Sequence, residues 1–281
     1  MLNKNKGWQR VLLIIIPYFF IVGIFQSIGM LIANVGLDNL YSQKSIEQNL
    51  IISFCDLVGT FLILWIFMRY IDEENFINIG FRIRNKSNEF ILGVGIGALI
   101  MGSGFFLLIV MDEISFYQFV FIPEKLIESI FLFIIVAVVE ETFMRGYVLR
   151  NLMASFNKYI ALAFSSILFS LMHAFNPYID YFISINLFLA GLVLGGAYVH
   201  TKNLWFPIGL HLGWNLFQTH FGFNVSGQDS YSLIEFNISE SNLINGGAFG
   251  FEGSILSIIS EIGLFIGIVL YYKKETNHNI T

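Results

Sequence analysis

Long apolar runs that are almost free of charge constrain this chain more than any other feature of its sequence. Eight such runs cover about residues 11–34, 49–68, 90–111, 126–149, 157–175, 182–199, 204–219 and 254–272. Runs of roughly 18 or more apolar residues are typical of transmembrane helices. Charged residues make up 12% of the chain, against about 25% in soluble domains, so too few polar side chains exist to cover a water-facing surface. The sequence predicts an all-α, polytopic membrane bundle of about eight transmembrane helices, with residues 1–281 forming a single integral membrane domain.

Positively charged residues collect in alternate connections between the apolar runs. One set of connections holds Lys4, Lys6, Arg10, Arg69, Arg82, Arg84, Lys86, Arg145, Arg150, Lys158, Lys202, Lys273 and Lys274. The other connections hold Lys44 and Lys125. Because the cytoplasmic loops of membrane proteins carry the excess of lysine and arginine, we predict that both termini are cytoplasmic. We expect the first run to remain as a helix, since it is too long for a signal-peptide core.

Two adjacent acids, Glu140 and Glu141, stand within the fourth run. An ionisable residue inside a membrane helix is costly and is therefore a functional candidate. Glu141 and Arg145 are four residues apart, with the acid first, which favours an ion pair on one helix face. Neighbouring helix positions point about 100° apart, so Glu140 must face a different wall. We predict a structural role for Glu141 and a chemical role for Glu140.

Two histidine-containing pairs follow at the same helical spacing. Phe169 and His173 share one face of the fifth run, and His211 and Asn215 share one face of the seventh. A carboxylate shielded from water suits a general base near neutral pH, so Glu140 is expected to take a proton from an attacking water. His173 would orient that water or share its proton, and His211 with Asn215 would hold the oxyanion.

These groups form three motifs in chain order: Glu140-Glu141 with Arg145, Phe169 with His173, and His211 with Asn215. At these segments the chain resembles the CAAX-protease and bacteriocin-processing family, also called the Abi family, of intramembrane glutamic endopeptidases. The resemblance covers about residues 125–220. It implies an all-helical bundle of about eight spans with an active-site cavity open to one side. We expect no metal or other cofactor.

The resemblance also implies roles for individual residues. Glu140 would activate water, His173 would lie beside it, and His211 and Asn215 would stand at the oxyanion, with Phe169 supporting the site together with the Glu141 ion pair. The family's eukaryotic branch trims prenylated CAAX proteins, whereas bacterial members are linked to peptide maturation or bacteriocin self-immunity. The chain looks bacterial, so we expect a bacterial cell membrane, a membrane-associated peptide or protein as substrate, and no nucleic acid. The sequence does not indicate an oligomeric state.

Three other interpretations stay open. Glu140, His173 and His211 would make a catalytic zinc set, although the chain lacks a His-Glu-x-x-His sequence. A non-catalytic immunity or scaffold protein would bind a peptide within the bilayer. A transporter would use further membrane acids such as Asp56 and Glu261, which are otherwise expected to be packing or helix-end residues.

The depths of the candidate residues present a difficulty. Counted from the expected cytoplasmic helix ends at 1.5 Å per residue, Glu140 and His211 lie at about 12–15 Å and His173 at about 24 Å. Tilt, a kink, or a fourth helix that extends past Arg150 would bring them together. We expect His173 within about 10 Å of Glu140 if the site exists.

The remaining expectations concern packing and loops. The segment of about 222–253 is long for a connection and is expected to be a lid, a plug or solvated filler. Cys55 is the only cysteine and is expected to be a packed thiol. Small-xxx-small spacings predict close helix approach at Gly93/Gly97, Gly191/Gly195 and Gly263/Gly267.

Overall fold

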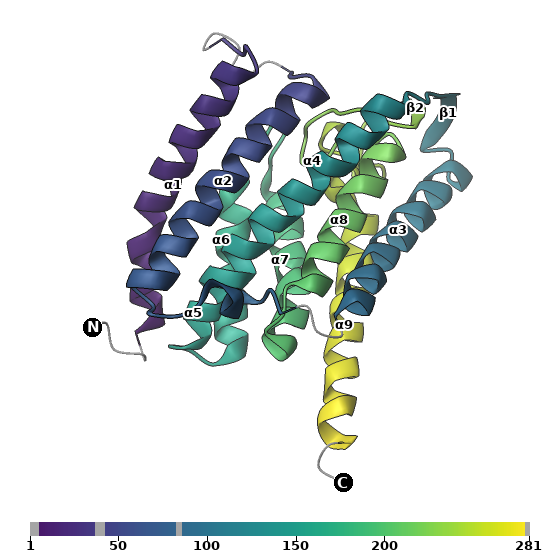
Figure 1. The fold of residues 1–281 in the computed structure, drawn as a ribbon. Helices are drawn as coiled ribbons and strands as arrows, with labels where there is room; N and C mark the ends of the chain where they lie inside the picture. Colours follow the sequence, from purple (N-terminus) through teal and green to yellow (C-terminus); the bar gives the residue numbers. More distant parts are fainter. Residues whose placement is uncertain (1–5, 37–42, 83–85, 279–281) are drawn as a thin grey trace.

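A computed structural model describes residues 6–36, 43–82 and 86–278, with the side chains of 275–278 excepted. Lys4 and Arg84, two of the positive charges used to predict the orientation, lie outside the described residues. The fold is an all-α bundle whose two chain ends lie at the same end of the molecule (Figure 1).

Each of the eight predicted runs lies on a helix of the described chain. The helices are α1 (Gly7–Ile32), α2 (Ile46–Tyr70), α3 (Ser87–Val110), α4 (Pro123–Glu141), a π-helix (Thr142–Leu149), α5 (Arg150–Met153), α6 (Lys158–Met172), α7 (Tyr181–Thr201), α8 (Trp205–His220) and α9 (Ile255–His278). The fourth run is continuous through α4, the π-helix and α5. The prediction of an all-α polytopic bundle is confirmed.

The helices differ in how well they suit a membrane. Within the described ranges, five helices are long and apolar enough to cross it: α1, α2, α3, α7 and the part of α9 from Ile255 to Lys274. Helices α6 and α8 are shorter, with 15 and 16 residues, and α4 carries several acids. The three helices that hold the candidate motifs are therefore the short or polar ones, because their side chains face one another as well as lipid.

Burial distinguishes a central helix from peripheral ones. At most 28% of the apolar segment of α1, α2, α3 or α9 is buried, against 61% for α7. The exposed side chains on the outer helices are large and apolar, as at Ile16, Phe20 and Leu99, which suits contact with lipid. Helix α7 forms the middle of the bundle.

Close backbone packing fixes α8 against α3. A Cβ atom at Gly97 would lie 2.4 Å from the Trp214 backbone nitrogen, and one at Gly213 would lie 2.4 Å from the Val94 carbonyl oxygen. The predicted approach at Gly93/Gly97 is confirmed, and it sets the position of the helix that carries His211 and Asn215.

The other two glycine pairs have opposite outcomes. Gly191 would place a Cβ 2.8 Å from the Ser166 Cα atom, so close packing of α7 on α6 is confirmed. Nothing lies within 4 Å of the Cβ positions of Gly263 and Gly267. The prediction for α9 is wrong, since this helix turns that face away from its described neighbours.

Polar contacts gather at the end of the bundle that holds the termini. Arg10 lies 2.9 Å from Asp72, and Arg150 pairs with Glu74. These contacts join the start of α1, the segment after α2, and α5, which Figure 1 shows at the lower end. The connections in which the positively charged residues collect thus lie at one end of the bundle, as the charge pattern predicts. Arg145 does not belong to that group, because it is 1% exposed and buried in the bundle.

The opposite end carries short elements that the sequence patterns did not predict. They are β1 (Ile114–Phe119), β2 (Ile234–Ile238), η4 (Gly247–Phe249) and η5 (Phe251–Gly253). A further short element that was not predicted, η2 (Phe76–Ile79), lies near the termini. Strands β1 and β2 pair in antiparallel, so the long loop after α8 is attached to the connection between α3 and α4. This pair lies at the upper end in Figure 1.

Candidate active site

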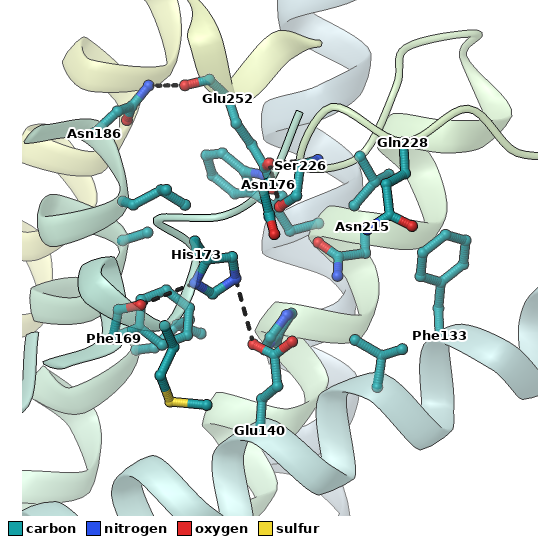
Figure 2. A pocket seen from close by; sticks show the side chains of 18 of the residues that line it. Phe133, Glu140, Phe169, His173, Asn176, Asn186, Asn215, Ser226, Gln228 and Glu252 are labelled. Carbon is teal, nitrogen blue, oxygen red and sulfur yellow. Dashed lines mark hydrogen bonds and ion pairs between the residues drawn. The ribbon is translucent and has the colours of Figure 1, made fainter. Parts of the chain in front are cut away.

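Glu140 and His173 face each other across the space between α4 and α6. The Oε2 atom of Glu140 lies 3.9 Å from Nε2 of His173, as Figure 2 shows. The His173 Nδ1 atom lies 2.9 Å from the carbonyl oxygen of Phe169, and a carbonyl accepts, so Nδ1 carries the hydrogen. In the neutral ring, Nε2 therefore presents a lone pair to Glu140. The separation is well inside the 10 Å that we expect for a shared site.

The difference in depth between Glu140 and His173 disappears because the fourth helix is longer than predicted. It continues through the π-helix and α5 to Met153, past Arg150, while α6 begins at Lys158. Counted from these ends at 1.5 Å per residue, Glu140 lies about 20 Å deep and His173 about 22 Å deep. The π-helix begins directly after Glu141, and such segments are frequent at functional sites.

Glu141 is the centre of a buried ion-pair network. Arg145 Nη1 donates to Glu141 Oε1 at 2.9 Å, and the predicted pair is confirmed. The side chains of Glu141 and Arg145 are at most 1% exposed. The Arg145 guanidinium lies 4.3 Å from the centre of the Phe169 ring and donates to the Gly191 carbonyl oxygen at 3.4 Å. One arginine therefore links α6 and α7 to the helix that carries both acids.

His211 contacts Glu141, which the sequence did not predict. Its Nδ1 atom lies 2.9 Å from Glu141 Oε1, so Nδ1–H donates to the carboxylate. The Nε2 atom is then a donor only when the ring is protonated, with Glu141 as its counter-charge. Our expectation that His211 donates to an oxyanion thus requires the imidazolium form.

Asn215 lies one turn beyond His211 on α8, and both line the same cavity. Their exposed fractions are 5% and 7%. Figure 2 shows the Asn215 amide turned towards the cavity, across from His173. The structure brings Glu140, His173, His211 and Asn215 to one cavity, and it places Glu141, Arg145 and Phe169 in contacts beside them.

The cavity has a volume of about 340 Å³, in the usual range for ligand pockets. Its walls come from α2, α4, α6, α7, α8, α9 and the long loop after α8. That loop contributes Val225, Ser226, Gln228, Asp229, Ser230 and Glu252. The 222–253 segment therefore forms part of the cavity wall, and the interpretation as solvated filler is wrong.

One protein family matches this part of the chain. Residues 122–217 match the family model described as Type II CAAX prenyl endopeptidase Rce1-like. This segment is similar to that family. The matched segment runs from the start of α4 into α8 and includes all seven candidate site residues, so the predicted family resemblance is confirmed. Neither a curated protein nor a solved structure matches the chain.

The match to the Rce1-like model supports intramembrane endopeptidase activity in general, and the apolar helices make the chain an integral membrane protein. Among the described residues, no group of three or more His, Cys, Asp and Glu side chains is arranged to hold a metal ion. The Nδ1 atom of His211 is hydrogen-bonded to Glu141, so Nε2 is the ring nitrogen that faces a ligand.

Several residues around the matched segment were not predicted to belong to the cavity. They are Asn176, Asn186 and Glu252, together with Glu261, which the sequence suggested only as a transport or packing acid. Glu252 follows a glycine-rich stretch, and no periodic pattern could place it next to motifs on other helices. Asp56 has a packing role instead, since it accepts hydrogen bonds from Gln26 at 2.9 Å and Thr60 at 3.1 Å.

Proposed function

We propose that this protein is an intramembrane endopeptidase that hydrolyses a peptide bond of a membrane-associated peptide or protein with a water molecule activated by Glu140. The observation that carries the proposal is the facing pair of Glu140 Oε2 and His173 Nε2, 3.9 Å apart. Both atoms are acceptors when the carboxylate is ionised and the imidazole neutral. A water at about 2.8 Å from each atom can donate one hydrogen to each, which leaves its lone pairs free for attack.

The reaction follows from this arrangement. Glu140 takes one proton as the water oxygen attacks the scissile carbonyl carbon. The carbonyl oxygen gains negative charge and accepts hydrogen bonds from the Asn215 amide and from the protonated His211 ring. Glu140 or His173 then returns the proton to the leaving nitrogen, and the carbon–nitrogen bond breaks to give a carboxylic acid and an amine.

The supporting contacts explain how the reacting groups would be held. Phe169 fixes the His173 ring through its carbonyl oxygen, and the Glu141–Arg145 pair holds α4 against α6, α7 and α8. Electrostatic stabilisation of a transition state requires groups that are already in position before the substrate binds, and these contacts would hold them there. We further propose that both termini are cytoplasmic in a bacterial membrane, where the substrate is a peptide undergoing maturation or a bacteriocin.

The first test is cleavage of a library of hydrophobic peptides by the purified protein in liposomes, with products identified by mass spectrometry. Products at defined bonds support the proposal. Failure to cleave peptides of any composition, by protein that is shown to be folded, contradicts it and favours a binding role.

A chelator should change the cleavage rate by less than about twofold. The reason is that Glu140 and His173 suffice to activate water by general-base chemistry. Rates are measured with and without the chelator and after addition of zinc. Loss of cleavage with chelator and its return with zinc would favour the metal-dependent mechanism instead.

Replacing Asn215 by alanine should lower kcat by about 10²–10³-fold, with little change in KM, because an oxyanion donor acts mainly in the transition state. The matched control is Asn237→Ala, an exposed asparagine on β2 outside the cavity. A change in KM alone for Asn215→Ala would show that Asn215 binds substrate without stabilising the transition state.

A further inference from the structure

The cavity contains more negative charge than hydrolysis needs. Its described lining residues include four carboxylates, on Glu140, Asp229, Glu252 and Glu261, and none of them is lysine or arginine. Glu140 has a role in the proposed reaction, but the other three have none. Asp229 is exposed on the loop, but the half-buried Glu252 and the buried Glu261 call for a positively charged partner.

Glu252 is held in place by the loop around it. Its Oε2 atom accepts hydrogen bonds from the backbone nitrogen and the hydroxyl of Ser226, at 3.0 Å and 3.1 Å. Its carbonyl oxygen accepts from the Asn186 side chain on α7, as Figure 2 shows. The side-chain hydrogen bonds of Glu252 within the described structure all use Oε2, so Oε1 keeps its capacity to accept from a ligand.

Close backbone contacts that require glycine hold the two arms of the loop together at this point. Gly250 has a φ of +100°, and a Cβ atom there would lie 1.9 Å from the Asn224 carbonyl oxygen. Gly227 donates its backbone N–H to the Phe249 carbonyl oxygen at 3.0 Å. The two arms of the loop are thus bonded to each other, and Glu252 is presented from a fixed frame.

Glu261 on α9 adds an independent observation. It is 2% exposed, it lines the cavity, and its Oε2 atom is buried without a hydrogen-bond partner among the described residues. Its Oε1 atom has only a long contact of 3.5 Å with the Ser257 hydroxyl. Because buried polar atoms are almost always hydrogen-bonded, this oxygen indicates a donor that the protein does not supply.

Both acids line the same cavity, so their charges repel each other when both are ionised. Burial raises the pKa of the Glu252 carboxyl, while protonation of His173 or His211 and the hydrogen bonds from Ser226 oppose that rise. Glu252 shares the cavity with the reacting histidines and with the buried acid Glu261. A cation placed between Glu252 and Glu261 would relieve the repulsion and supply the missing donor.

We propose that Glu252 and Glu261 form a subsite for a cationic group of the substrate, an ammonium or a guanidinium, close to the scissile bond. This inference rests on the proposed function and adds a substrate class to it. The cation can be a lysine or arginine side chain, or the free amino terminus of a peptide. In each case its N–H groups would donate to Glu252 Oε1 and Glu261 Oε2.

The test uses one hydrophobic peptide that the protein cleaves, with lysine, arginine, norleucine or glutamate placed in turn at each position near the cleaved bond. Each peptide is made with a free and with an acetylated amino terminus. The protein variants are wild type, Glu252→Gln, Glu261→Gln and Glu240→Gln. Glutamine at position 252 keeps the acceptor for Ser226, and Glu240 is an exposed acid of the same loop outside the cavity.

Wild type should cleave the best lysine or arginine peptide with a kcat/KM at least about 10-fold above that of its norleucine counterpart, as expected for a charge-assisted contact. Glu252→Gln and Glu261→Gln should each reduce this ratio below about threefold, whereas Glu240→Gln should keep it. A preference that persists after acetylation identifies a side chain, and one that acetylation removes identifies the amino terminus. Equal kcat/KM for cationic and neutral peptides would overturn the subsite and leave the protease intact.

Binding to the Glu140→Gln variant separates failure of the subsite from failure of the protease. Affinity is measured for the same peptides with this variant in lipid nanodiscs. If no peptide is cleaved by wild type but cationic peptides bind at least about 10-fold more tightly than neutral ones, the subsite stands and the proposed hydrolysis fails. Equal affinities in that measurement would overturn the subsite whatever the outcome of the cleavage assay.

Discussion

Glu140→Gln should lower kcat for peptide cleavage by at least about 10³-fold while the protein still binds its substrate. Glutamine has the shape of glutamate but cannot accept a proton from water, and general-base catalysis contributes about 10²–10⁴-fold to a rate. The facing His173 keeps its acceptor Nε2, because its Nδ1–H donates to the Phe169 carbonyl oxygen, but the water would lose one of the two groups that polarise it. The measurement is single-turnover cleavage in liposomes, with peptide affinity determined in parallel.

The matched control for this substitution is Glu124→Gln. Glu124 lies on the same helix, in its exposed first turn, and does not line the cavity. The Glu124→Gln variant should cleave peptides at the wild-type rate. If Glu140→Gln retained more than about a tenth of wild-type kcat, Glu140 would not be the base, and the reaction would need a different group from the cavity wall.

The convergence of the three motifs was predictable because helical spacing fixes which residues share a face. Glu141 and Arg145, four residues apart, form the pair that the spacing predicts. The family resemblance added the expectation that three separate helices meet, which spacing within one helix cannot provide. The 3.9 Å between Glu140 and His173 agrees with that expectation.

Contacts between distant segments were not predictable in the same way. His211 and Glu141 are far apart in the chain, and no periodicity reports which nitrogen of a histidine faces which acid. The depth of Glu140 was misjudged because the end of the fourth helix depends on a π-helix that apolar periodicity does not reveal. Glu252 lies on an irregular loop whose path is set by backbone hydrogen bonds and by β1–β2 pairing rather than by a repeating pattern.

Spacing alone also overpredicts packing. Gly93 and Gly263 begin the same small-xxx-small pattern, yet a Cβ atom at Gly93 would lie 2.6 Å from the α8 backbone and nothing lies within 4 Å at Gly263. The pattern permits a close approach, but a neighbouring helix must also be present on that face. Which glycine-bearing helix faces pack against a neighbour therefore depends on how the helices assemble.

Arg145→Met should have the largest effect on stability, with a loss of about 3–5 kcal/mol in the free energy of unfolding. The substitution keeps an unbranched apolar side chain but leaves the Glu141 carboxylate, buried at 0% exposure, with His211 in place of the arginine as its cationic partner, and breaking a buried ion pair costs about that much. The stacking of the guanidinium on Phe169 and its bond to the Gly191 carbonyl oxygen are lost as well. The measurement is unfolding in mixed detergent micelles, followed by circular dichroism.

The matched control is Arg150→Met, which removes an arginine from the same continuous helix. Arg150 pairs with Glu74 near the end of the bundle, and the two side chains are 19% and 38% exposed. Water can solvate the acid that remains, so the loss should be about 0–1 kcal/mol. The double variant Glu141→Gln with Arg145→Met should recover part of the stability, because it removes the buried charge together with its partner. If Arg145→Met lowers the free energy of unfolding no more than Arg150→Met does, Glu141 is solvated or protonated. The contact between Glu141 and His211 would then not depend on Arg145.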